Sequence, residues 1–493
     1  MASTDVAVPR AIARPRLSAL LEREGLVVGV VSAYAASVAY RLPLRVAQDA
    51  WFALVGGRQV VRHGLPGSDT LTYWTVGKHW IDQQWIAQAA SYGLYSVGGI
   101  KLFALSHLAL VVLALALVVV AARRRGASPR AVAWTAIVVV YLLALAAGHA
   151  RTQSFAYPLF ALVLLLLLDD VRRPSRRVFL VLPLLALWAN VHGSVVLGAL
   201  LVALHGALVM LRGDRSSRAL VRGGLLVAGS AFSLIATPWF AGTLGYYRST
   251  LFNSSFKDIL SEWRAPTLTL ELLPLYLLAG GALWLLGRNR RRFTAFEQLA
   301  LLLLLALAFV AQRNIVWLAL ASVPLLAPAL DAVLPRPVRP ARAQVNVAFA
   351  LFAAVIAGIV VAASALKPES SYLEQWPTGA ATAVASAARA DPSARIYANE
   401  QYADWLLLVR PALAGRVAYD VRFELLSKAQ LAAIFRWRSQ IGPQWASAAK
   451  GARIVVLALP VERPNERALL AQRGVRVLYR DSRISVLLRL RGA

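Results

Sequence analysis

Residues Ala131–Leu168 read AVAWTAIVVVYLLALAAGHARTQSFAYPLFALVLLLLL, a long apolar run with one polar interruption at His149, Arg151 and Gln153. Arginines stand near both of its ends. Arginine and lysine collect at the cytoplasmic ends of membrane helices. One long helix would place arginines on both sides of the membrane, whereas two helices joined at the interruption keep them on one side. The stretch therefore predicts a helical hairpin whose turn carries the polar residues at the outer surface.

Two later runs repeat this pattern. Val178–Leu211 is interrupted by Asn190 and His192, and Leu299–Leu334 is interrupted by Gln312, Arg313 and Asn314. We predict a hairpin for each, although the arms of the first are shorter than the roughly 20 residues that a span usually needs. Five single spans complete a chain that is expected to cross the membrane about eleven times: Gly25–Leu44, Ile100–Ala122, Gly224–Ala236, Leu272–Leu286 and Val345–Leu366.

The composition agrees with a polytopic membrane protein. A hydrophobic fraction of 59% and a mean hydropathy of +0.59 exclude an ordinary soluble globule. The net charge of +29 lies mostly in short loops between apolar runs, which favours a lipid bilayer as partner and argues against nucleic acid. The absence of cysteine excludes disulfides and thiolate metal sites. We expect a multi-pass protein of the cell (inner or plasma) membrane.

The predicted fold class is an α-helical membrane protein with a C-terminal α/β domain outside the membrane. Residues 1–24 are expected to form a cytoplasmic tail and not a removed signal peptide, because no cleavage site of the Ala-x-Ala kind follows the first apolar run. Residues 25–366 form the membrane domain, which includes outer loops 45–99 and 237–271. Residues 367–493 alternate predicted strands with helices. The strands are Ala394–Ala398, Val417–Tyr419, Arg453–Leu459, Val475–Tyr479 and Ile484–Leu490, and the helices are Ala380–Ala390, Ser427–Arg436 and Glu466–Arg473.

The first outer loop carries the most specific motifs. Asp49-Ala-Trp51 follows span one, and a Gly-Leu-Pro-x-x-Asp segment ends at Asp69. A strand-like piece at Thr70–Thr75 leads to Gly-Lys-x-Trp-x-x-x-x-Trp, which ends at Trp85. This loop resembles that of the GT-C superfamily, membrane glycosyltransferases that use polyprenyl-phosphate-linked sugars. The segments around Arg151, His192, Glu262-Trp263 and Arg313-Asn314 are similar to features of uncharacterised bacterial members. The chain departs from many active members because Ala50, not an acidic residue, follows Asp49. It also lacks the Trp-Trp-Asp signature of oligosaccharyltransferase catalytic subunits.

The resemblance implies that Asp49 is a general base, or a metal ligand, which activates an acceptor hydroxyl. The alternative is an interfacial carboxylate paired with Arg45 or Arg58. Arg151 and Arg313 would bind the phosphate of the donor and stabilise it as it leaves. Their alternative is that they reach lipid headgroups.

Other polar residues of the outer loops are candidates for the same site. Asn190 and His192 either bind substrate or satisfy a hairpin turn, and Asn314 lies beside Arg313. Glu262 and Trp263 are candidates for binding a sugar through its hydroxyls and its face. Asp69 either joins the site or stabilises a turn, and Asp82 either joins it or pairs with His79 or Lys78. Together with His63 and His79, these two aspartates are candidates for a divalent metal site. In the tail, Asp420 and Arg422 are expected to form a structural pair.

The leading hypothesis is an inverting glycosyltransferase that moves a sugar from a polyprenyl-phosphate donor to an extracytoplasmic glycan, lipid or protein. One alternative is a transporter or flippase of lipid-linked glycans, which predicts charges near the bilayer midplane. The other is a catalytically inactive relative that binds glycans or acts as a scaffold.

Overall fold

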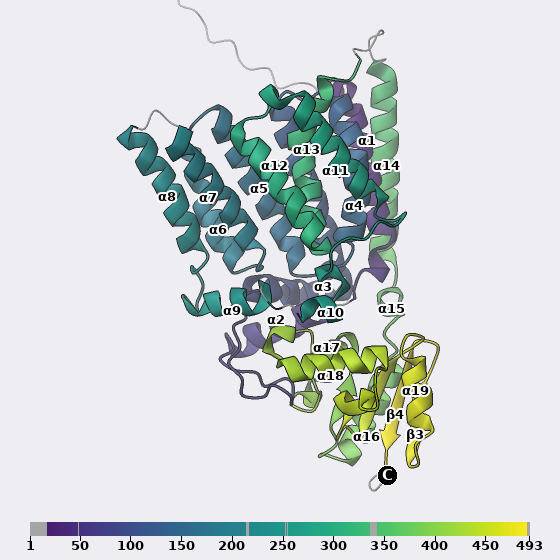
Figure 1. Cartoon of the computed structure of the whole chain (residues 1–493). Coiled ribbons are helices and arrows are strands. Elements are labelled where there is room, and N and C mark those ends of the chain that lie inside the picture. Colours follow the sequence, from purple (N-terminus) through teal and green to yellow (C-terminus); the bar gives the residue numbers. More distant parts are fainter. Residues whose placement is uncertain are drawn as a thin grey trace, which may run out of the picture.

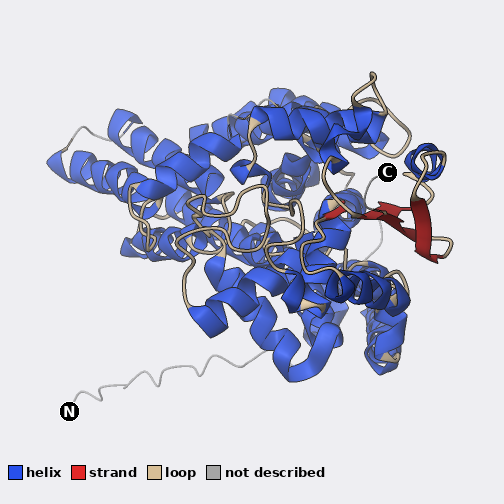
Figure 2. Cartoon of the chain, turned by 90° about the horizontal axis from the view of Figure 1, so that it is seen from below, coloured by secondary structure: helices blue, strands red, loops and turns tan. Residues whose placement is uncertain are grey.

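The computed structural model describes residues 17–47, 49–212, 216–251, 253, 255–335 and 343–490. Long, roughly parallel helices form a bundle, and a smaller domain made from the C-terminal residues lies against one end of it (Figure 1). Seen from below, the described strands gather in one small sheet at the edge of a largely helical molecule (Figure 2).

Each of the three interrupted runs is two helices, so the predicted breaks are confirmed. The helices on either side of the breaks are α4 Pro129–Ala146 and α5 Gln153–Arg172, α6 Val181–Ala189 and α7 Val195–Arg212, and α12 Ala295–Val310 and α13 Ile315–Asp331. A 3-10 turn, Arg176–Leu180, leads into α6 and lengthens that short arm. The breaks fall where polar residues end each apolar stretch.

The remaining helices of the bundle correspond to the predicted single spans. They are α1 Leu17–Tyr40, the second part of α3 Trp85–Arg124, α8 Ser217–Ser233, α11 Leu273–Arg288 and α14 Ala343–Leu366. Helix α3 bends at Gly98 and Gly99, where Gly99 has a φ of 62° that glycine adopts readily. The part of α3 before the bend packs on α2, Asp49–His63.

Five described helical segments are long and apolar enough to cross a membrane. They are Trp85–Arg124, Pro129–Ala146, Gln153–Arg172, Gln312–Asp331 and Ala343–Leu366. Three shorter apolar helices accompany them, Val195–Leu211, Leu273–Arg288 and Ala295–Val310. The count of about eleven crossings therefore stays a prediction.

The arginine-rich loops lie at the end of the bundle away from the C-terminal domain (Figure 1). Arg125 and Arg172 both pair with the buried Glu297, at 2.5 and 3.5 Å. Arg125 directly follows α3, Arg172 ends α5 and Glu297 lies in α12, so one carboxylate connects the ends of three helices. The arginine-rich loops thus lie at one end of the bundle, and the polar residues that interrupt the apolar runs lie at the other, as the sequence pattern predicts.

The C-terminal sheet has the order β1-β2-β4-β3. Strands β1 Ile396–Ala398 and β2 Ile454–Ala458 are parallel, whereas β4 Ile484–Arg489 is antiparallel to β2 and to β3 Val475–Arg480. The helices of this region are α15 Glu369–Tyr372, α16 Thr378–Ala390, α17 Glu400–Val409, α18 Lys428–Ser439 and α19 Arg463–Leu470. Four predicted strands and all three predicted helices are confirmed with shifted ends.

Two predicted strands are wrong. Val417 makes single bridges to Ile396 and Thr72, and neither 70–75 nor 417–419 extends into a strand. The carboxylate of Asp69 bends the first of these segments, because it accepts hydrogen bonds from Leu71 N, Thr72 Oγ1 and Thr75 Oγ1 at 2.6 to 2.9 Å. A turn held in this way cannot continue a ladder.

The first outer loop nevertheless joins the C-terminal domain. Tyr73 N donates to Val417 O at 2.9 Å, and Gly415 N donates to Leu71 O at 2.8 Å. Arg58 of α2 donates to the carbonyls of Leu407 and Leu408 at the end of α17. The loop and the C-terminal domain are therefore packed as one unit over the end of the bundle.

Candidate active site

A cavity of about 630 Å³ lies where the helical bundle, the outer loops and the C-terminal domain meet. Segments far apart in the sequence contribute to it: α2, the turns α6–α7 and α12–α13, helix α9 (Gly242–Leu251), residues 256–263 and the C-terminal domain. Of the residues singled out in the sequence, five groups line it, namely Asp49, His192, Glu262 with Trp263, Arg313 and Asn314. Four of the eight polar residues that interrupt the apolar runs thus line one cavity, namely Gln153, His192, Arg313 and Asn314.

The charged residues of this region form a linked chain. Arg151 Nη1 lies 3.0 Å from Glu262 Oε2 and 4.0 Å from Asp49 Oδ2. Arg313 Nη1 lies 3.7 Å from the other oxygen of Glu262. Burial opposes ionisation of Glu262, but Arg151 and Arg313 outweigh it and lower the pKa of this carboxyl to about 2. Glu262 is therefore a fixed anion that positions two guanidinium groups.

Asp49 begins α2 and faces the cavity, with 42% of its side chain exposed there. Desolvation in the cavity raises the pKa of Asp49, although the positive charge of Arg151 lowers it in part. Of the two alternative partners considered from the sequence, Arg58 binds the carbonyls of α17, and the ion pair of Asp49 among the described residues is with Arg151 and not with Arg45. Asp49 is thus a carboxylate in a cavity, with one loosely placed cation beside it.

The two arginines differ in their access to the cavity. Arg313 lines it and stacks on Trp263, with its guanidinium carbon 4.2 Å from the ring centre. Arg151 is 9% exposed, pairs with Asp49 and Glu262, and is not among the described residues that line either cavity. Only Arg313 of the pair is open to a ligand in this conformation. Lys257 and Arg438 also line the cavity, and no motif in the sequence pointed to them.

His192 and Asn190 have different surroundings although they are neighbours in the chain. His192 Nδ1 accepts from Ser194 N at 3.1 Å, and burial lowers the pKa of this histidine well below its ordinary value. It is a neutral imidazole on the cavity wall. Asn190 instead bonds Trp85 Nε1, Ala186 O and Ala236 O, and thereby holds three segments together.

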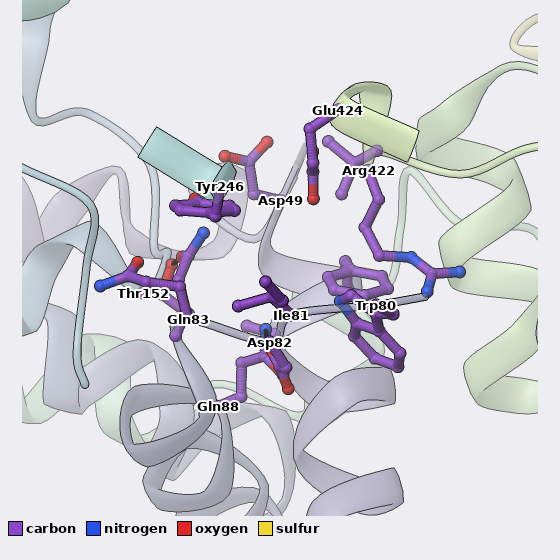
Figure 3. A pocket seen from close by; sticks show the side chains of 14 residues that line it. Asp49, Trp80, Ile81, Asp82, Gln83, Gln88, Thr152, Tyr246, Arg422 and Glu424 are labelled. Carbon is purple, nitrogen blue, oxygen red and sulfur yellow. Dashed lines mark hydrogen bonds between the residues drawn. The ribbon is translucent and has the colours of Figure 1, made fainter. Parts of the chain in front are cut away.

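A second cavity of about 90 Å³ adjoins the first, and Figure 3 shows its lining. Five described residues line both cavities: Asp49, Gln84, Tyr246, Val421 and Glu424. Asp82 lies on the far side from Asp49 in Figure 3 and accepts a hydrogen bond from Gln88 at 2.8 Å. Asp82 is not paired with the partners considered from the sequence, because Lys78 donates to Leu425 O and His79 Nδ1 contacts Gly67 O.

Asp69 is not among the described residues that line either cavity, although its partner Arg422 lines the small one. It is fully buried, holds the turn at 69–75 and pairs with Arg422 at 2.7 Å. Arg422 also pairs with Asp420 at 2.5 Å, as expected, and stacks over Trp80 at 4.2 Å. His63 and His79 are exposed. Within the described ranges, no group of three His, Cys, Asp or Glu residues is placed to hold a metal ion.

Replacement of Asp82 by asparagine should change how stability depends on pH. Asp82 is 3% exposed, and burial outweighs Arg422 to raise its pKa to about 7. The folded protein therefore binds a proton that the unfolded chain, with a pKa near about 4, releases, so stability falls as pH rises from about 4 to 7. Asp82→Asn should remove up to about 3 kcal/mol of this fall. Thermal unfolding of the detergent-solubilised protein at pH 5 and pH 8 measures it. The exposed Asp258→Asn is the control, and parallel pH slopes for wild type and Asp82→Asn would contradict the prediction.

Comparison with solved structures identifies the fold. No family model and no curated protein matches the sequence. The structure of ArnT from Cupriavidus metallidurans bound to undecaprenyl phosphate is similar, with a TM-score of 0.51 and 16% identity over 94% of this chain and 98% of that one. The Archaeoglobus fulgidus oligosaccharyltransferase is similar with a TM-score of 0.50 and 13% identity over 87% of this chain and 69% of that one. Both are GT-C glycosyltransferases, and the resemblance read from the first outer loop is confirmed for the fold.

Proposed function

We propose that this protein is a membrane glycosyltransferase that transfers a sugar from a polyprenyl-phosphate donor to an acceptor on the outer face of the membrane. The observation that carries the proposal is one cavity that exposes both a carboxylate, Asp49, and a guanidinium, Arg313, beside an apolar wall. This reaction needs a base at the acceptor, a cation at the leaving phosphate and a path for a lipid chain.

The apolar wall comes from α7 and α12 and includes Leu197, Leu200, Leu307 and Val310. Leu200 is 45% exposed and Val310 is 57% exposed, so this side of the cavity is continuous with the outer surface of the bundle. A polyprenyl chain would pass between these helices from the bilayer. Its phosphate would then lie at Arg313, with His192 and Asn314 beside it.

The residues support a single displacement. Asp49 accepts the proton of the acceptor hydroxyl, whose oxygen forms a bond to the anomeric carbon of the donor sugar. The bond from that carbon to the phosphate oxygen breaks, and the lipid phosphate leaves with the bonding electrons. Arg313 stabilises the negative charge that it gains. Arg151, which the sequence suggested as a second phosphate ligand, instead fits a role in positioning Asp49 and Glu262.

Two observations support this assignment. ArnT, which shares the fold, has been crystallised with undecaprenyl phosphate. The arginine-rich loops lie opposite the cavity, so the positive-inside rule would place the cavity, outer loops 45–99 and 237–271, and domain 367–493 outside the cell membrane. The chain would then begin in the cytoplasm and cross the membrane about eleven times between residues 25 and 366.

Mass spectrometry of lipid-linked sugars and envelope glycans tests the function. Cells without the protein should accumulate one polyprenyl-phosphate sugar and lose that sugar from one envelope glycan. The pair of changes would also name the donor and the product. Normal amounts of both compounds in the deletion strain would contradict the proposal.

Arg313→Gln should weaken binding of undecaprenyl phosphate by about tenfold to a hundredfold, because a charge-assisted contact to phosphate is lost. The affinity can be measured with purified protein in lipid nanodiscs. Arg291→Gln, at the opposite end of the bundle, is a matched control and should bind like wild type. Unchanged affinity in Arg313→Gln would remove this residue from the donor site.

A further inference from the structure

One wall of the cavity belongs to the C-terminal domain. The described residues of this wall are Glu400, Gln401, Val421, Phe423, Glu424 and Arg438. It is largely polar, in contrast to the leucine-rich wall from α7 and α12. The two walls therefore suit different molecules, a lipid on one side and a polar substrate on the other.

Glu424 is the acidic residue of this wall that lines both cavities. Asp49 also lines both, and Figure 3 shows the two side chains at the same side of the small cavity. Its neighbour on the wall, Glu400, is already paired with Arg438 at 2.6 Å. Among the described residues, no side-chain hydrogen bond or ion pair engages the carboxylate of Glu424. It is therefore available to a ligand.

The backbone around Glu424 is held by the first outer loop. Two residues earlier, Arg422 pairs with Asp69 at 2.7 Å. One residue later, Leu425 O accepts from Lys78 Nζ at 2.9 Å. The same loop follows α2, which carries Asp49. These contacts fix Glu424 relative to Asp49, as a preorganised substrate-binding group requires.

We propose that Glu424 binds a hydroxyl group of a saccharide acceptor, adjacent to the hydroxyl that Asp49 deprotonates. This inference rests on the proposed transferase function. Glu424 and Gln401 offer a carboxylate and an amide on this wall, and these hydrogen-bonding groups fit the hydroxyls of a sugar. Burial raises the pKa of Glu424 to about 7, so near neutral pH its carboxyl both donates and accepts hydrogen bonds.

The test separates acceptor binding from donor binding. Purified wild type, Glu424→Gln and the control Glu374→Gln are assayed in nanodiscs for two quantities. The first is affinity for undecaprenyl phosphate. The second is the concentration of acceptor that half-saturates transfer, with lipid extracts of the deletion strain as donor and its envelope glycan fraction as acceptor. Glu374 is an exposed residue of the same domain, 70% exposed, and lines neither cavity among the described residues.

We expect Glu424→Gln to raise the half-saturating glycan concentration about tenfold, which is the effect of one weakened polar contact, with affinity for undecaprenyl phosphate unchanged. Glu374→Gln should match wild type in both. If Glu424→Gln does not fold, Glu424→Asp, which keeps the charge but withdraws the carboxylate, should show the same separation.

Three results would overturn the inference. The first is a half-saturating glycan concentration in Glu424→Gln equal to that of wild type. The second is a loss of undecaprenyl phosphate affinity in Glu424→Gln as large as its loss of acceptor use. The third is transfer by wild type only to the protein or lipid fraction of the envelope. Failure of the proposed function looks different, because wild type itself would then transfer no sugar.

Discussion

Asp49→Asn should lower sugar transfer by about 10³-fold, the usual contribution of a general base, and leave donor binding nearly intact. Asparagine keeps the shape of the side chain but has no carboxylate to accept the acceptor's proton. The raised pKa of Asp49, caused by its recess from bulk water, makes it a stronger base than an exposed aspartate. Transfer and undecaprenyl phosphate affinity, measured on the same preparation, show the two effects separately.

The outcome also separates the proposed function from its alternatives. If purified Asp49→Asn transfers sugar as wild type does, Asp49 is not the base. If wild type transfers no sugar, and cells change their lipid-linked sugars on deletion but not with Asp49→Asn, the protein instead binds or transports a lipid-linked glycan. If transfer and lipid binding are lost together, Asp49 is part of the donor site and not the base. A pH profile supplies a further check, because transfer by wild type should fall as pH drops below the pKa of Asp49.

The hairpins could be predicted because their cause is local. His149, Asn190 and Arg313 each interrupt an apolar run that has arginines near both ends. Such polar residues are costly inside the bilayer, and the arginines mark its cytoplasmic side, so the interruptions are expected at the opposite surface. The same constraint brought the interrupting residues to one end of the bundle. This reasoning found His192, Arg313 and Asn314 of the cavity, whereas Asp49, Glu262 and Trp263 were singled out from the outer loops.

The remaining parts of the site depend on contacts that leave no periodic signal. Asp69 and Arg422 lie 353 positions apart, and their ion pair decides where Glu424 lies. The pairing of Arg151 with Glu262 could not be predicted from the sequence for the same reason. It depends on how residues 256–263 pack on the turn between α12 and α13. The strand-like spacing of Thr70–Thr75 was outweighed by the hydrogen bonds of Asp69, which no alternation pattern reveals.

Arg422→Met should cause the largest loss of stability, about 3–5 kcal/mol, which is the usual result of removing one partner from a buried ion pair. Asp69 is fully buried and Asp420 is 4% exposed, so the variant leaves two carboxylates without their cation. Methionine keeps much of the volume and contact with Trp80, which isolates the effect of charge. Denaturant unfolding and limited proteolysis between the bundle and the C-terminal domain measure the loss.

The exposed Arg389→Met is the control for Arg422→Met, and a loss below about 1 kcal/mol in Arg422→Met would show that water already solvates the cluster. The pH dependence has a definite sign. Burial raises the pKa of Asp69, but Arg422 and the Thr75 hydroxyl outweigh it, so the folded pKa is lowered. The stabilisation is therefore present above about pH 4 and is lost as pH falls below it. Adding Asp69→Asn to Arg422→Met should restore part of the stability but not acceptor use, because the cross-domain contact that positions Glu424 would still be missing.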